Sequence, residues 1–117
     1  MAAIRGAICA ENDVESIGSA SICLIEEIIG QNHLDVSDIE SIIFTVTADL
    51  DAAYPAKSVR EKFQMYNVAF MCAQEQFVAN SLDKCIRVCV TCGTLRQKDV
   101  KHCYVGKASV LRPDLSD

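Results

Sequence analysis

Residues 84–92, KCIRVCVTC, alternate between two kinds of side chain and are rich in valine and isoleucine. Such a run is typical of a β-strand, in which successive side chains point to opposite faces of a sheet. One face of this strand would carry Ile86, Val88, Val90 and Cys92. The other face would carry Cys85, Arg87 and Cys89. The chain is therefore expected to fold around a sheet that presents an arginine on one of its faces.

The three cysteines of this stretch have C-x3-C-x2-C spacing, which could suit an iron–sulfur cluster. A cluster needs convergent thiolates, usually from a loop, whereas a strand separates Cys92 from Cys85 and Cys89. A fourth ligand would have to come from another segment, at His102 or Cys103. The pattern therefore predicts packed thiols and no metal ligands, and a thiol-based redox or metal-binding protein is the less favoured alternative.

Arg87 lies between apolar neighbours in the middle of this strand. An arginine in such a place either extends its charged head to an edge or serves a pocket. Burying the guanidinium without a partner would cost several kcal/mol. Arg87 therefore predicts an anionic partner, which is either a carboxylate of the protein or a ligand.

Four further segments have the composition of strands. Apolar or alternating runs predict strands at 2–9, 40–47, 68–73 and 101–111, the last interrupted near Gly106. Together with two main helices, the five strands predict an α+β fold, with a mixed five-stranded sheet and helices packed on one face.

Two segments carry helix signals. Asn12 and Glu15 have capping-box spacing, so a helix is expected to begin there and to end at Gly30. One stripe of this helix is expected to face the core: Val14, Ile17, Ser21, Leu24, Ile25 and Ile28. Pro55 suits the first turn of a second helix, over residues 55–63.

The length and charge of the chain exclude several classes of protein. With 117 residues it fits a single domain, 1–117, and a net charge of −5 without a basic cluster disfavours nucleic-acid binding. No apolar run approaches the roughly 20 residues of a membrane-spanning helix, and no signal segment is visible. Seven cysteines without a secretory signal favour reduced thiols and a cytoplasmic location.

Six short blocks, in one order along the chain, resemble the AroH-type chorismate mutases, which are small monofunctional isomerases. The blocks are IRGA at 4–7, YPAKSVRE at 54–61, CAQE at 72–75, KCIRV at 84–88, HCY at 102–104 and LRPDLS at 111–116. The resemblance implies a homotrimer arranged as a pseudo-α/β-barrel, with active sites at subunit interfaces. It implies cofactor-free conversion of chorismate to prephenate, toward phenylalanine and tyrosine.

The resemblance also implies the catalytic residues. Arg87 matches the arginine that contacts the ether oxygen and a carboxylate of the substrate. Arg5 matches an arginine that binds a substrate carboxylate, and Glu75 matches a glutamate that accepts a hydrogen bond from the ring hydroxyl. Without the resemblance, Arg5 and Glu75 would be interpreted as solvated charges.

The remaining matched positions are implied to bind substrate. Tyr104 donates its hydroxyl to a carboxylate, Cys72 lies near the ring hydroxyl, and Lys57 and Arg60 are cations at the pocket rim. The full set of substrate-binding positions is Tyr54, Ala56, Lys57, Arg60, Phe70, Met71, Cys72, Tyr104, Leu111 and Arg112. Leu111 and Arg112 begin a tail that in the family closes over the site.

The chain departs from the family pattern at several positions. Ile8 and Cys9 replace a threonine-containing segment, and Tyr54 stands where phenylalanine is common. Phe70 and Met71 are bulkier than the usual pair, which predicts a narrower pocket with lower turnover or an altered substrate fit. A trimeric small-molecule-binding protein of similar fold, without mutase activity, is the main alternative. The combination of Arg5, Glu75, Arg87 and Tyr104 disfavours that alternative, because together these residues form a pocket for a dianion.

Overall fold

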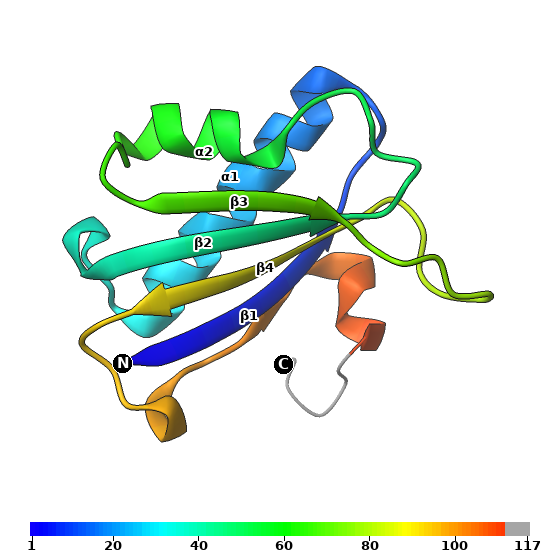
Figure 1. Cartoon of the computed structure of the whole chain (residues 1–117). Coiled ribbons are helices and arrows are strands. Elements are labelled where there is room, and N and C mark those ends of the chain that lie inside the picture. Colours follow the sequence, from blue (N-terminus) through cyan, green and yellow to red (C-terminus); the bar gives the residue numbers. More distant parts are fainter. Residues whose placement is uncertain (112–117) are drawn as a thin grey trace.

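The computed structural model describes residues 1–111 and is built on one five-stranded sheet (Figure 1). The strands are β1 (Ala2–Cys9), β2 (Ile39–Val46), β3 (Ala69–Gln74), β4 (Cys85–Cys92) and β5 (Cys103–Tyr104). The helices are α1 (Val14–Asn32) and α2 (Pro55–Phe63), with short 3-10 helices η1 (Val36–Asp38), η2 (Gln97–Asp99) and η3 (Gly106–Leu111). The first four strands and both helices lie where the sequence predicts them, to within about two residues.

The sheet is mixed, as predicted. Its strand order is β3-β2-β4-β1-β5, so β4 is the central strand. It pairs antiparallel with β1 and β2, whereas β5 runs parallel to β1 and β3 runs parallel to β2. This order places β3 and β5 at the two opposite edges of the sheet, a separation that matters for the site below.

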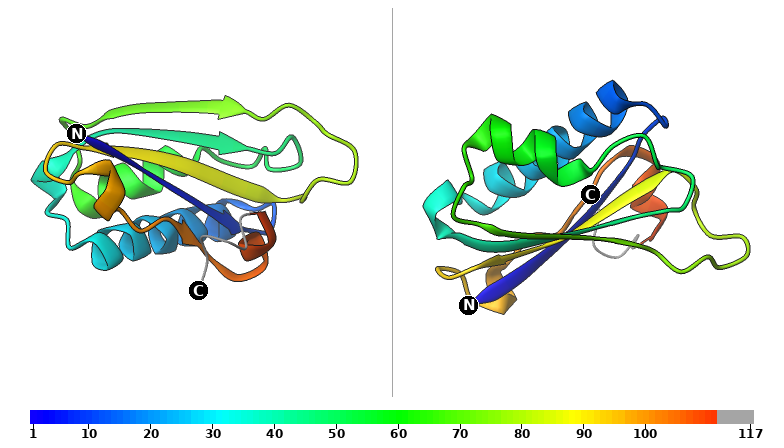
Figure 2. Two further views of the ribbon diagram at one scale, coloured as in Figure 1. Left: turned by 90° about the horizontal axis from the view of Figure 1, so that it is seen from below. Right: turned by 45° about the horizontal axis from the view of Figure 1, so that its top comes forward.

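Both α-helices cover the same face of the sheet (Figure 2), which confirms the predicted α+β arrangement. The inner face of α1 is fully buried at Ile17, Leu24, Ile25 and Ile28. These side chains belong to one apolar core with strand residues such as Ile42 and Phe44. No helix within residues 1–111 is long and apolar enough to cross a membrane. We call this side of the sheet the covered face and the other side the open face.

The first turn of α1 differs from its prediction. Asp13, rather than Asn12, caps the helix, since its Oδ1 accepts a hydrogen bond from the Ser16 backbone N–H at 2.7 Å. Asn12 instead holds the loop after β2, donating from Nδ2 to Asp51 Oδ1 at 2.8 Å. Val14 was expected in the apolar stripe but is 66% exposed, because the helix begins beyond the core at this end.

The end of α1 is also later than predicted. Gly30 does not stop the helix, which continues to Asn32 and ends at His33 in a left-handed conformation (φ 52°). The buried Asn32 side chain donates to the Lys101 carbonyl at 2.9 Å and accepts from its N–H at 2.7 Å. This bridge to the segment before β5 extends the helix beyond the point that local signals predict.

The predicted strand at 101–111 is wrong beyond Tyr104. Only Cys103–Tyr104 is extended, and Gly106 (φ 57°) turns the chain into η3. A positive φ is readily adopted by glycine, so this residue redirects the chain instead of interrupting a longer strand. Ala108 of η3 then packs in a small second cluster with Ala7 and Cys85.

Candidate active site

Strand β4 presents its two rows of side chains as the alternation predicts. Ile86, Val88, Val90 and Cys92 are buried in the core on the covered face. The Arg87 side chain lies on the open face and is 44% exposed. Because Cys92 is on the covered face, the three cysteines do not converge. Within residues 1–111, no group of three or more His, Cys, Asp or Glu side chains is arranged to hold a metal ion.

Arg87 forms an ion pair with Glu75, which directly follows β3. The Arg87 Nε lies 3.0 Å from Glu75 Oε1, and the Glu75 side chain is only 19% exposed. The sequence predicts an anionic partner for Arg87, either a protein carboxylate or a ligand. The structure shows that a protein carboxylate, that of Glu75, is one such partner. The planar guanidinium carries five N–H donors in a rigid fork, so one protein carboxylate does not use its whole capacity.

Thr45 supports this pair and was not predicted. Its hydroxyl donates to the same Glu75 Oε1 at 2.6 Å, and it lies directly opposite Arg87 in the β2–β4 register. The Glu75 backbone N–H also donates to the Val46 carbonyl at 2.8 Å. These contacts hold the carboxylate at a fixed place beside the guanidinium.

A cavity of about 360 Å³ brings together the predicted residues of three neighbouring strands. It is lined by Arg5 and Gly6 of β1, Arg87 and Val88 of β4, Tyr104 of β5, and Leu111. None of these described lining residues carries a carboxylate. Two guanidinium groups and a phenol hydroxyl around one concave space suit a small anionic ligand.

Gly6 permits this close arrangement of strands. A Cβ atom added at this residue would lie 2.8 Å from the Cys103 carbonyl oxygen, closer than real Cβ contacts allow. The Arg5 backbone N–H beside it donates to His102 Nδ1 at 2.9 Å. Glycine therefore lets β5 approach β1, which brings Tyr104 near Arg5 and Arg87.

A second cavity, of about 250 Å³, is also lined by Arg87. Its lining includes Glu75, Thr47 and Phe77, together with the loop that precedes β4. Arg87 therefore lines both cavities, whereas Glu75 lines only the second.

The other predicted binding residues lie at the opposite edge of the sheet, on α2 and β3. Tyr54 and Cys72 line a third cavity of about 400 Å³. Lys57 and Arg60 are exposed on α2, where Ala56 is half-buried. Within one chain the structure does not bring this group to Arg5 and Tyr104. Arg112 lies outside the described residues.

Phe70 and Met71 point to different faces of β3. Phe70 packs against the core on the covered face, whereas Met71 is 64% exposed on the open face beside Ile43. Cys72 follows Met71 on the same strand. Burial raises the pKa of its thiol, so this cysteine stays protonated at neutral pH. Cys72 is therefore suited to weak hydrogen bonding and packing rather than to nucleophilic attack.

The profile of the family described as chorismate mutase type I matches residues 1–115. The chain belongs to this family. It is 43% identical over 115 residues to the chorismate mutase AroH of Bacillus subtilis (strain 168), covering 97% of this chain and 91% of that protein. It is 38% identical over 115 residues to the chorismate mutase AroH of Thermus thermophilus, covering 96% of this chain and 93% of that protein.

A solved structure of a chorismate mutase from Clostridium thermocellum has the same fold. Its TM-score with this chain is 0.89 at 41% identity, over 94% of this chain and 99% of that one. The type I chorismate mutase resemblance inferred from the six sequence blocks is therefore confirmed, and so is the expected mixed sheet with its helices.

Proposed function

We propose that this chain converts chorismate to prephenate, in the synthesis of phenylalanine and tyrosine, and that Arg87 is the central catalytic residue. The observation that carries the proposal is the cavity on the open face, where Arg5, Arg87 and Tyr104 surround a space of about 360 Å³. Membership of the type I chorismate mutase family names the reaction, and this cavity offers groups with the chemistry that the reaction needs.

The reaction is a [3,3] rearrangement in which a carbon–oxygen ether bond breaks while a carbon–carbon bond forms. It needs no nucleophile, proton transfer or cofactor, but the ether oxygen gains negative charge in the transition state. An enzyme for it must hold the substrate in a compact conformer and place fixed donors beside that oxygen. Arg87 is held by Glu75, which is held in turn by the Thr45 hydroxyl, so the donors of Arg87 are positioned before the substrate binds.

The cavity residues Arg5 and Tyr104, together with Glu75 beside Arg87, are proposed to bind the two carboxylates and the ring hydroxyl. Arg5 and the Tyr104 hydroxyl are donors for a carboxylate, and Glu75 is the acceptor for the hydroxyl. The ion pair with Arg87 offsets the charge of Glu75, which would otherwise repel a dianion.

We further propose that the residues of α2 and β3 complete the site from a neighbouring subunit of a homotrimer, arranged as a pseudo-α/β-barrel. This set contains Tyr54, Ala56, Lys57, Arg60, Phe70, Met71 and Cys72. Support comes from the strand order, since β3 and β5 are opposite edges of one sheet. The exposed Ile43 and Met71 on the open face add apolar surface that a second subunit would cover. A cytoplasmic location stays an expectation from the sequence.

The proposal is tested by mixing the purified chain with chorismate and following its loss and the formation of prephenate by chromatography. We expect full conversion, at the same rate with and without EDTA. Tight binding of chorismate without conversion would favour a non-catalytic binding protein, and a rate that EDTA abolishes would contradict a metal-free reaction. Light scattering after size exclusion tests the trimer, whose mass should be three times 12.8 kDa.

A further inference from the structure

Two cysteines outside the proposed chemistry, Cys9 and Cys85, lie directly opposite each other on β1 and β4. The next pair along, Ala10 and Lys84, is joined by a hydrogen bond from the Ala10 N–H to the Lys84 carbonyl at 3.0 Å. Hydrogen-bonded and non-hydrogen-bonded pairs alternate in an antiparallel ladder, so Cys9 and Cys85 form a pair of the second kind. In such pairs the Cα atoms are about 4.5 Å apart, within the range that a disulfide spans.

The backbone contacts of Cys85 agree with this assignment. Its N–H donates to Thr47 Oγ1 at 2.9 Å, and its carbonyl accepts from the Thr47 N–H at 3.1 Å. Both groups therefore point away from Cys9 and toward the strand on the other side. The two side chains share one face and pack in the same small cluster with Ala7 and Ala108. Burial raises the pKa of the Cys9 thiol, and an interaction with the Cys85 thiol partly lowers it.

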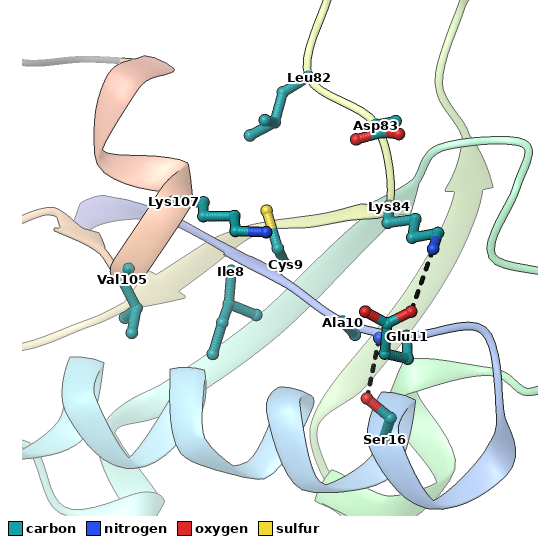
Figure 3. A pocket seen from close by; sticks show the side chains of 11 residues that line it. Ile8, Cys9, Ala10, Glu11, Ser16, Leu82, Asp83, Lys84, Val105 and Lys107 are labelled. Carbon is teal, nitrogen blue, oxygen red and sulfur yellow. Dashed lines mark hydrogen bonds and ion pairs between the residues drawn. The ribbon is translucent and has the colours of Figure 1, made fainter.

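Only one of the two thiols can be reached from solvent. Cys85 is fully buried, whereas Cys9 is half-buried and lines a cavity of about 490 Å³. Figure 3 shows the Cys9 sulfur in this cavity beside the Lys107 amine, with Leu82 and Asp83 above it. A reagent that enters the cavity therefore meets Cys9 first, because Cys85 is buried and does not line the cavity.

We propose that Cys9 and Cys85 form a reversible disulfide by exchange with a small-molecule disulfide such as oxidised glutathione. The Cys9 thiolate attacks one sulfur of the reagent, whose S–S bond breaks and releases a thiolate that takes up a proton. The Cys85 sulfur, after losing its proton, attacks Cys9 Sγ and displaces the second thiol. In the net reaction, two cysteine thiols are oxidised to a disulfide and one small disulfide is reduced to two thiols.

The surroundings of the pair favour a lasting bond over a rapidly exchanging one. Burial raises the pKa of the Cys85 thiol to about 12, and it also raises the pKa of Cys9 against the opposing charge of Lys107. Thiols of high pKa are poor leaving groups, so a disulfide between them is reversed slowly. We therefore expect the disulfide to form over a long incubation, and an added strong dithiol to reduce it.

A disulfide at this place would reach the proposed catalytic arginine. Cys85 lies two residues before Arg87 on the same face, and the guanidinium is close enough to lower the pKa of Cys85 through its charge and its N–H donors. Tyr104 and Leu111 pack against the same cluster. Drawing the Cys85 sulfur toward Cys9 changes this contact. Because small displacements of catalytic groups are costly, we expect a loss of activity of about ten- to a hundredfold. This consequence rests on the proposed function, whereas the disulfide itself does not.

The test is to incubate the full chain with oxidised glutathione, block remaining thiols, and digest it with trypsin and a glutamyl endopeptidase without reduction. Cleavage after Glu11 separates Cys9 from Cys23, and trypsin releases Cys85 in the peptide CIR, apart from Cys89 and Cys92. We expect a linked pair, GAICAE joined to CIR, that dithiothreitol removes. Cys23→Ser, on the exposed surface of α1, is the matched control and should give the same linked pair.

Absence of this linked pair, while other cysteines take up glutathione, would overturn the proposal, and this outcome needs no variant. In the activity arm, Cys9→Ser should start at the wild-type rate and keep it in oxidised glutathione, whereas the wild type should slow and recover with dithiothreitol. A linked wild type of unchanged rate would overturn the connection to Arg87. If the wild type does not convert chorismate at all, the proposed function is contradicted, but the linked peptides still test whether the disulfide forms.

Discussion

The covered and open faces of the sheet are built from the same strands but hold opposite kinds of side chain. On the covered face, Ile4, Phe44, Ile86 and Val90 are completely buried. One residue away along these strands, the open face holds the charged and polar groups Arg5, Thr45 and Arg87. Because side chains alternate with a period of two, one strand serves the core and the proposed pocket at once.

This difference means that stability and activity should be separable by substitutions one residue apart. Truncating a side chain on the covered face leaves a cavity in a packed core and lowers the free energy of unfolding. A change on the open face removes a donor from a preformed pocket, and its cost appears in the rate. Substitutions on the two faces therefore test whether stability and activity are separate.

The largest effect is expected for Arg87→Ala. Removing one preorganised donor from the transition state typically costs about 3–4 kcal/mol, or two to three powers of ten in rate. Steady-state kinetics with chorismate should show this loss in kcat. Urea unfolding should show a change of no more than about 1 kcal/mol, because the ion pair with Glu75 is partly exposed. A variant that keeps its rate would remove Arg87 from the chemistry.

Ile86→Ala is the matched change on the covered face. Ile86 is fully buried, so its truncation should destabilise the chain by about 2–5 kcal/mol in urea unfolding. The rate per folded molecule should stay close to that of the wild type. A loss of kcat comparable to that of Arg87→Ala would show that the two faces are not functionally separate.

Tyr104→Phe should have a smaller effect, chiefly on substrate affinity. The hydroxyl is proposed to bind a carboxylate in both ground state and transition state, and hydrogen bonds to charged groups contribute about 1.5–3 kcal/mol. The measured KM should therefore rise by about ten- to a hundredfold while kcat changes little. A fall in kcat at constant KM would instead assign Tyr104 to the transition state alone.

Thr45→Val is expected to have the smallest effect of the series. The Thr45 hydroxyl orients Glu75, which in turn holds Arg87, so its removal costs about one hydrogen bond, or 0.5–1.5 kcal/mol. We expect a several-fold loss of kcat, largely restored in Thr45→Ser, which keeps the hydroxyl. Equal rates for the valine and serine variants would show that Thr45 is only a structural residue.

Much of this architecture follows from local patterns in the chain. The alternation in 84–92 predicts both faces of β4, and Pro55 marks the first turn of α2. The ends of α1 could not be predicted, because Asn12 and Asn32 are used by segments far away in the sequence. The shortness of β5 has the same kind of cause, since Gly106 adopts a conformation that allows η3 to pack on the sheet.

The candidate site could be predicted only in part. Family blocks indicate Arg5, Glu75, Arg87 and Tyr104, but they do not give the contacts among them. The role of Thr45 depends on the register between β2 and β4, which no local pattern encodes. Strand order likewise separates the α2 and β3 positions from the cavity beside Arg87, and this motivates the proposal of a site shared between subunits.

The catalytic role of the Arg87 guanidinium is tested by measuring kcat/KM for chorismate with Arg87→Lys. In the proposed mechanism, catalysis depends on a guanidinium fork fixed on the open face, not on positive charge alone. This mechanism therefore predicts that the lysine variant, folded and as stable as the wild type, loses about two powers of ten in kcat/KM or more. A lysine variant within a few-fold of the wild type would contradict it.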